Sequence, residues 1–197
     1  MSYRSLIAAP LIVVLSTAAL ATALEIQTLQ CEQLTNPQGV DAKTPRLSWT
    51  SASATRGDKQ TAYQVLVATT AKRLAADNGD AWDSGKVESP DSVLVPYAGN
   101  DLKSHQRLYW KVRVWGENES AESEPAWFET AKMDEPWQAE WITPDWDDNA
   151  IHPILYRTFD LPARTVAARA YVCGLGLYHA ELNGQKIGSE HLTPYCN

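Results

Sequence analysis

The 197-residue sequence is poor in cysteine, phenylalanine and methionine, with three, two and two residues respectively. Cys31, Cys173 and Cys196 lie far apart, and their spacing excludes a zinc site of the Cys-x-x-Cys kind. An odd number leaves at least one cysteine unpaired within the chain, and we interpret all three as separate small apolar residues. The four histidines are scattered without metal-ligand spacing. The sequence therefore predicts no metal site built from cysteine or histidine.

Clustered basic residues are also missing, and the formal net charge is −7. Because nucleic-acid-binding surfaces need a positive patch, we expect no nucleic acid partner. After residue 23 no apolar run is long enough for a membrane-spanning helix. The modest acidity mainly favours solubility.

Residues 1–23 have the pattern of a secretory signal peptide. Arg4 supplies the positive start, residues 6–15 form a short apolar core, and Ala21-Thr22-Ala23 is a small-x-small cleavage site. The residues before Cys31 lack the small side chains of a lipoprotein signal. The sequence thus predicts a secreted or periplasmic protein.

Tryptophan and tyrosine are abundant, with eight of each, and the most informative stretch that holds them is 108–115. Its strict alternation predicts a strand with one buried face. The inward positions are Trp110, Val112 and Val114. Tyr109 and Trp115 lie on the other face, where their large rings predict partial cover by another element.

Residues 24–132 contain the pattern of an all-β domain. Seven short strands are expected, at 24–31, 45–49, 62–68, 82–87, 92–95, 108–115 and 126–130. A turn is expected at 117–122, and residues 71–76 are expected to form either a single helical turn or a plain loop. No long helix is expected. Short strands separated by turn residues are typical of an immunoglobulin-like or fibronectin type III-like sandwich.

Residues 133–197 predict a second, incomplete β-sandwich of the jelly-roll type, after a polar linker at 133–136 that ends in proline. Strands are expected at 139–142, 154–161, 168–175 and 177–182, and Asn183-Gly184 predicts a hairpin turn. The expected inner positions are Leu155, Phe159, Tyr171, Cys173 and Leu182. So few strands cannot close a sandwich, so we expect one apolar face without a cover.

Six ordered motifs point to a family. Five are Leu29-x-Cys31-Glu32-x-Leu34-x-Asn36-Pro37-x-Gly39-x-Asp41, Pro45-Arg46-Leu47-Ser48-Trp49, Gln60-Thr61-Ala62-Tyr63-Gln64, Trp82-Asp83-Ser84-Gly85-Lys86-Val87 and Tyr109-Trp110-Lys111-Val112-Arg113-Val114-Trp115. The sixth is Gly174-Leu175-Gly176-Leu177-Tyr178-x-x-x-Leu182-Asn183-Gly184-x-Lys186-x-Gly188. Together they resemble the N-terminal region of bacterial α-L-rhamnosidases. The sequence departs from that family at Leu177, where an aromatic residue is usual, and at Tyr195-Cys196-Asn197.

The resemblance implies an exported enzyme that hydrolyses terminal α-L-rhamnose from glycosides with inversion. In this family, an α/α barrel downstream of such domains carries a catalytic acid and a carboxylate that activates water. This sequence contains no paired helices of that kind, so we assign no catalytic residue. The resemblance implies a non-catalytic N-terminal portion, whose partners are the downstream barrel and, through the full-length enzyme, rhamnose-containing glycosides or polysaccharides.

Sugar binding needs an exposed aromatic ring with a few amides or carboxylates. Tyr178, Asn183 and Trp146 have suitable side chains, although Asn183 is first of all a turn residue. In some members of the resembled family the second domain binds rhamnose with calcium. Asp145, Asp147 and Asp148 are the clustered carboxylates that would suit this ion, and a solvated acidic loop is the alternative interpretation. No other cofactor is expected.

Two other functions remain open. The chain could act as a stand-alone carbohydrate-binding module, or as a cell-surface adhesion protein of fibronectin type III repeats. The sequence shows no internal repeat of the first domain, which argues against the adhesion protein.

Overall fold

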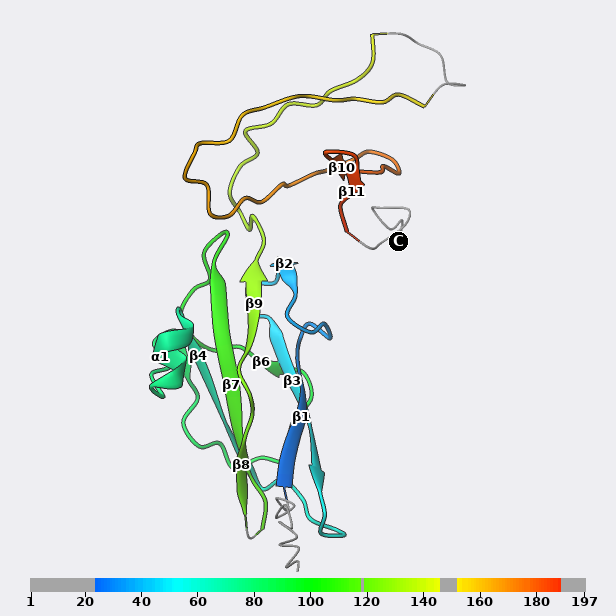
Figure 1. The fold of residues 1–197 in the computed structure, drawn as a ribbon. Coiled ribbons are helices and arrows are strands. Elements are labelled where there is room, and N and C mark those ends of the chain that lie inside the picture. The colour runs from blue at the N-terminus through cyan, green and yellow to red at the C-terminus, as the bar shows by residue number, and fades with distance from the viewer. Residues whose placement is uncertain (1–23, 118, 146–151, 189–197) are drawn as a thin grey trace, which may run out of the picture. The chain divides into compact units, whose positions relative to one another are not determined.

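The computed structural model describes residues 24–117, 119–145 and 152–188 (Figure 1). The chain divides into two compact units, one up to Ala139 and one from Glu140 onward. Nearly all regular structure in both units is β. The single helix among the described residues, α1 (Ala71–Ala75), is far too short to cross a membrane.

The first unit contains two sheets. The larger sheet has the strand order β2-β9-β7-β4-β5, with β8 also paired to β7, and the smaller has the order β1-β3-β6. Their bounds are β1 Leu24–Cys31, β2 Gln38–Val40, β3 Arg46–Ser53, β4 Ala62–Ala68, β5 Trp82–Asp83, β6 Val95–Pro96, β7 Arg107–Trp115, β8 Ser120–Glu122 and β9 Ala126–Thr130. All pairings are antiparallel except that of β2 with β9. This architecture confirms the predicted immunoglobulin-like sandwich.

The core lies between the two sheets. β4 and β7 pair in register, with Val65 opposite Val112 and Val67 opposite Trp110, so that their inward side chains form one layer. Leu47 and Trp49 of β3 belong to the same buried cluster. Trp110 is only 1% exposed, and Val112 and Val114 are fully buried, which confirms the inward face of the predicted central strand.

A polar cross-link completes this core. The buried Trp49 indole donates its Nε1–H to Gln60 Oε1 at 2.9 Å. The amide nitrogen of Gln60 in turn donates to the carbonyl oxygens of Ser89 and Asp91, at 3.2 and 2.8 Å. Since a buried N–H without an acceptor is costly, Gln60 allows an indole to fill the interior.

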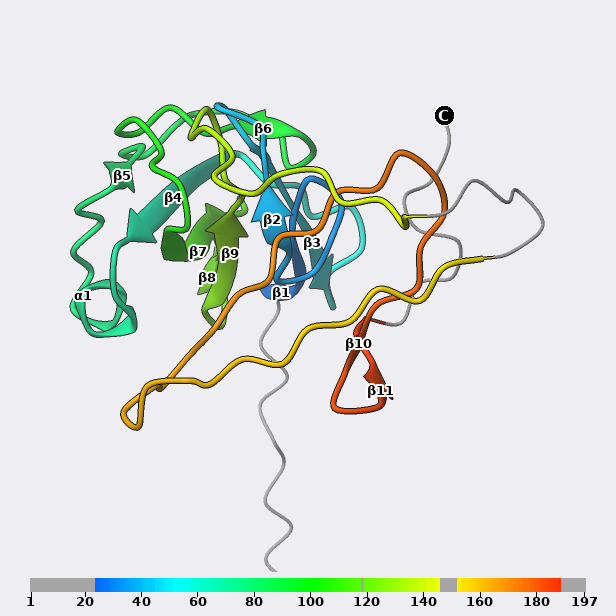
Figure 2. The same ribbon diagram turned by 90° about the horizontal axis from the view of Figure 1, so that it is seen from above.

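The helix α1 covers part of the outer face of the larger sheet. Thr70 caps it, because its hydroxyl accepts a hydrogen bond from the Arg73 backbone N–H at 3.2 Å. Leu74 is fully buried against Leu66 and Ala68, with Tyr109 packed beside them. Figures 1 and 2 both show α1 on the side of β4 and β7 that faces away from β1 and β3. The predicted partial cover of Tyr109 is thus confirmed.

Some element predictions for the first unit were wrong. Residues 117–122 contain a strand, β8, which returns along β7 with Trp115 opposite Ser120. The expected strand at 92–95 is reduced to β6, because Leu94 lies at φ +56°, outside the extended region. The described unit has nine strands instead of seven, since β2 and β8 were not among those expected.

The segment after β9 is attached to the first unit. Ala131 donates its N–H to Val40 O at 2.7 Å, and the Ser104 hydroxyl donates to Lys132 O. His105 Nε2 and Glu135 Oε2 lie 2.8 Å apart, and Lys43 pairs with Asp134 at 2.7 Å. These contacts hold residues 131–135 against the first unit.

The second unit has one regular element in its described residues, a hairpin of β10 (Glu181–Leu182) and β11 (Gln185–Lys186). Asn183 at φ +51° and Gly184 at φ +75° form its turn, as predicted. The strands predicted at 154–161 and 168–175, and that at 139–142, are absent from the described residues, and only the end of 177–182 is a strand.

The physical reason is that alternation selects a face, whereas a strand exists only when a neighbour accepts its hydrogen bonds. The expected inner positions of the second unit are all exposed: Leu155, Phe159, Tyr171, Cys173 and Leu182. The expected uncovered apolar surface is therefore present, without the sheet that was expected to carry it.

Candidate functional site

The side chains predicted to contact sugar belong to the second unit. Tyr178 is half-buried beside Gly174, where an added Cβ would come within 2.7 Å of the tyrosine ring. Asn183 is exposed in the β10–β11 turn, and no hydrogen bond joins it to Tyr178 in the described structure. Trp146 lies outside the described residues. The sugar-binding role of these residues stays a prediction.

The predicted calcium ligands are only partly covered by the structure, because Asp147 and Asp148 lie outside the described residues. Within the described ranges, no three His, Cys, Asp or Glu side chains are grouped so that they could hold a metal ion. A calcium site in the second unit stays a prediction.

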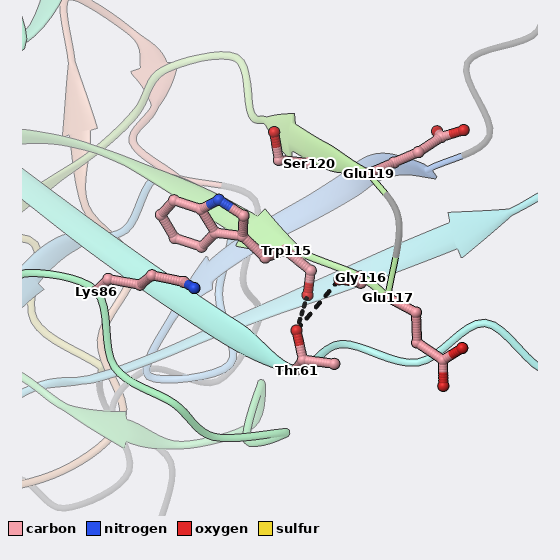
Figure 3. Close-up of a pocket in the computed structure, with 7 residues that line it drawn as sticks. All are labelled: Thr61, Lys86, Trp115, Gly116, Glu117, Glu119 and Ser120. Atoms are coloured by element: carbon pink, nitrogen blue, oxygen red, sulfur yellow. Dashed lines mark hydrogen bonds between the residues drawn. The ribbon is translucent and has the colours of Figure 1, made fainter.

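The first unit contains a cleft that the sequence analysis did not identify (Figure 3). Its volume is about 420 Å³, and it lies where β7 turns into β8, beside the start of β4 and the loop after β5. The lining residues are Thr61, Lys86, Trp115, Gly116, Glu117, Glu119 and Ser120.

The backbone around this cleft, the Trp115 cleft, is fixed by hydrogen bonds. Thr61 donates its N–H to Trp115 O at 2.7 Å, and its hydroxyl lies 3.2 Å from the carbonyl oxygens of both Trp115 and Gly116. Gly116 donates its N–H to Glu119 O at 2.8 Å, which closes the turn into β8. A Cβ at Gly116 would approach Asp58 Oδ1 to 2.9 Å, so a larger residue there would displace the Asp58 side chain.

The electrostatics of the cleft are mixed. Lys86 Nζ lies 5.2 Å from the centre of the Trp115 ring, within the range of a cation–π contact, and pairs with Glu88 at 2.9 Å. The carboxylates of Glu117 and Glu119 lie on the rim and point away from the indole in Figure 3. The partial cover predicted for Trp115 is thus supplied by a lysine side chain.

A second charged cluster lies on the outer face of β7, where Lys111 is 8% exposed at its side chain. Its ammonium lies 2.5 Å from Asp77 and 2.7 Å from Glu122, and Arg113 also bonds to Glu122. Burial disfavours the charged lysine, but the hydrogen bonds to Asp77 and Glu122 outweigh it and raise the Lys111 pKa. Since every charge in this cluster has an opposite partner, we interpret it as structural.

Burial of Glu122 opposes its ionisation and by itself would raise its pKa. The hydrogen bonds from Lys111 and Arg113 overcome that effect, and the Glu122 pKa lies below its ordinary value of 4.5. The hydrogen bond from Lys111 likewise lowers the pKa of Asp77. Both carboxylates are therefore held ionised, which makes neither of them a proton donor at neutral pH.

The sequence offered one signal for the Trp115 cleft, namely the tryptophan on the outward face of the central strand. The lining residues come from three parts of the sequence: Thr61, Lys86 and the stretch from Trp115 to Ser120. Spacing along the chain could not predict that Thr61 and Lys86 lie beside Trp115. Lys86 in particular lies in a loop whose course depends on the pairing of Tyr63 with Val87.

Two family models match parts of this sequence. Residues 26–134 match the family model described as "Rha78A-like, N-terminal immunoglobulin domain", and residues 163–197 match the "Alpha-L-rhamnosidase N-terminal domain". An alpha-L-rhamnosidase of Streptomyces avermitilis is 49% identical over 125 residues, which cover 62% of this chain and 12% of that protein. An alpha-L-rhamnosidase of Formosa agariphila is 33% identical over 201 residues, which cover 89% of this chain and 21% of that protein.

A solved structure gives the same result. The Streptomyces avermitilis alpha-L-rhamnosidase complexed with L-rhamnose superimposes with a TM-score of 0.56 at 49% identity, over 61% of this chain and 12% of that one. The chain thus spans about an eighth to a fifth of the length of the relatives that it matches. Because the first family model covers more than half of the sequence, this chain belongs to the alpha-L-rhamnosidase family and corresponds to its N-terminal region.

Proposed function

We propose that the chain is the accessory, non-catalytic N-terminal portion of an exported enzyme that releases terminal α-L-rhamnose from glycosides with inversion. The observation that carries this proposal is the unequal coverage: 89% of the chain aligns with the Formosa agariphila relative, yet it spans only 21% of that protein. The chemistry then belongs to a downstream catalytic barrel, and rhamnose-containing glycosides or polysaccharides are the substrates of the whole enzyme.

Two measurements test this function. The purified 197-residue protein should give no turnover of an aryl α-L-rhamnoside above a blank. In a domain exchange, residues 24–139 should replace the immunoglobulin-like domain of the Streptomyces avermitilis enzyme with retention of its activity, because the two segments share sequence and fold. Deletion of that domain is the control and should reduce soluble, active enzyme. Turnover by the isolated chain that one carboxylate substitution abolishes would contradict the proposal.

Export is part of the same proposal. The signal-peptide pattern at 1–23 supports a secreted or periplasmic enzyme, and β1 begins at Leu24, whose side chain is buried in the first unit. Cleavage after Ala23 would therefore keep all the described residues of β1 in the mature protein. N-terminal sequencing of the exported product should identify Leu24 as its first residue, and a product that retains Arg4 would contradict this.

We also retain a sugar site in the second unit as a proposal, with Tyr178, Asn183 and Trp146 as contacts and calcium as its cofactor. The half-buried ring of Tyr178 and the exposed amide of Asn183 support it. Titration of L-rhamnose with calcium and with a chelator tests it, and identical binding under both conditions would exclude the calcium requirement.

A further inference from the structure

We propose that the Trp115 cleft is a second carbohydrate site, in which a neutral sugar ring lies against the indole of Trp115. The sugar class rests on the proposed function, whereas the site itself rests on the geometry of the first unit. It is distinct from the site proposed around Tyr178, which belongs to the second unit.

The lining residues have the chemistry of a sugar site. An indole offers an apolar surface for the C–H face of a pyranose, and that of Trp115 is partly exposed at the end of β7, with Lys86 over part of it. Thr61, Lys86 and Ser120 line the same cleft (Figure 3). The Lys86 ammonium can donate to a sugar, and the Thr61 hydroxyl oxygen, whose proton goes to the backbone carbonyls, can accept from one. A volume of about 420 Å³ is within the range of small-molecule sites.

The aromatic surface is held in position before any ligand arrives. The Thr61 N–H and the single Thr61 hydroxyl proton, which is shared between the carbonyl oxygens of Trp115 and Gly116, hold the backbone here, and the Gly116 N–H donates to Glu119 O. Pairing of Trp115 with Ala62 on one side and Ser120 on the other anchors the strand. Binding therefore orders little of the protein, which favours affinity.

The charges select an uncharged ligand. Glu117 and Glu119 on the rim repel an anionic sugar such as a uronate, and the single lysine is already paired with Glu88. A cationic ligand would need the position over the Trp115 ring that the Lys86 ammonium already holds, and the two positive charges would repel. A neutral sugar with several hydroxyl groups satisfies both restrictions.

The position of the cleft separates it from the end of the sandwich where the chain departs. Trp115 is the last residue of β7, whereas Ala131 is hydrogen-bonded to Val40 and His105 near the opposite end of that strand. Nine residues of extended strand span about 30 Å. A ligand in the Trp115 cleft therefore leaves the exit segment uncovered, and the first unit can hold a glycan independently of it.

The test uses the 197-residue protein with two neutral probes, L-rhamnose and a rhamnose-terminated disaccharide, and with D-glucuronate as the anionic control. Saturation-transfer NMR and calorimetry should detect saturable binding of a neutral probe and at least tenfold weaker binding of D-glucuronate. Trp115→Ala should weaken binding of the neutral probe at least tenfold. Ser120→Arg should do the same by filling the cleft, since Ser120 is exposed on the short strand β8.

The matched control is Trp137→Ala. Trp137 is a tryptophan of the first unit that also has a lysine over its ring, Lys132 at 5.6 Å, but it is more exposed than Trp115 and does not line the cleft. Its substitution should leave binding within about twofold. Circular dichroism and urea unfolding show that each variant is folded.

Three results would overturn the proposal: no saturable binding of either neutral probe, equal binding by wild type and by a folded Ser120→Arg protein, or a loss caused by Tyr178→Ala and not by Trp115→Ala. The last result would place the sugar in the second unit. The domain exchange described above is independent of sugar binding, so a failure of the cleft leaves the accessory function standing.

Discussion

The two units of this chain carry similar hydrophobic patterns and reach different structures. In the first unit, alternating residues such as those of β4 and β7 face an opposing sheet and are buried. In residues 152–188, alternating apolar residues are exposed, Tyr156 to 90% and Leu175 to 90%. The difference teaches that alternation defines which side chains would face a core, while burial requires a second layer to supply that core.

The largest expected effect is the contrast in amide hydrogen exchange. Amides of β7 from Leu108 to Val114 should exchange at least about a thousandfold more slowly than those of 154–175, because only the former lie in a closed sandwich. Exchange followed by NMR or mass spectrometry measures both in one sample. Equally strong protection of the two stretches in a monomer would contradict the predicted difference in exchange rates.

Removal of a central side chain tests whether the first unit depends on its layered core. Trp110→Ala should lower the free energy of unfolding by about 3–5 kcal/mol, as large-to-small changes at packed sites do. Trp141→Ala, at a tryptophan that is 67% exposed in the second unit, is the matched control and should change it by less than about 0.5 kcal/mol. Urea unfolding monitored by circular dichroism measures both, and similar losses would contradict the comparison.

Loss of the hydrogen bond between Trp49 and Gln60 should lower the free energy of unfolding by a smaller amount. Gln60→Ala leaves the buried Trp49 indole N–H without its acceptor, and should cost about 1–3 kcal/mol. Gln38→Ala provides a control at an exposed glutamine in β2. Urea melts of the two variants should differ by the cost of the lost bond, and equal midpoints would show that water replaces Gln60 at no cost.

The smallest expected effect is a pH dependence of the charged cluster on β7. The Glu122 pKa is lower in the folded protein than the ordinary 4.5, so its stabilising contribution is present above that value and declines as pH falls through the folded pKa. Glu122→Gln should therefore be less stable than wild type at neutral pH, and the gap should narrow in acid. Unfolding midpoints of wild type and Glu122→Gln from neutral to acidic pH measure this difference in stability. A difference that does not change with pH would show that the shifted pKa of Glu122 contributes nothing.

Much of the first unit could be predicted from the sequence, because the relevant signals are local. The inward face of Trp110, Val112 and Val114 and the covered ring of Tyr109 follow from periodicity and residue type. The turn at Asn183-Gly184 follows from the tolerance of both residues for positive φ.

Tertiary structure alone decided the rest. The burial of Lys111 depends on Asp77 and Glu122, which reach it from outside its own strand. The Trp115 cleft likewise depends on Thr61 and Lys86, which long-range pairing brings beside the end of β7. By itself the sequence determined which side of each strand is apolar, because that property repeats every two residues. Which strands find partners, and which side chains meet at a surface, depends on contacts between distant segments, and only the folded chain makes them.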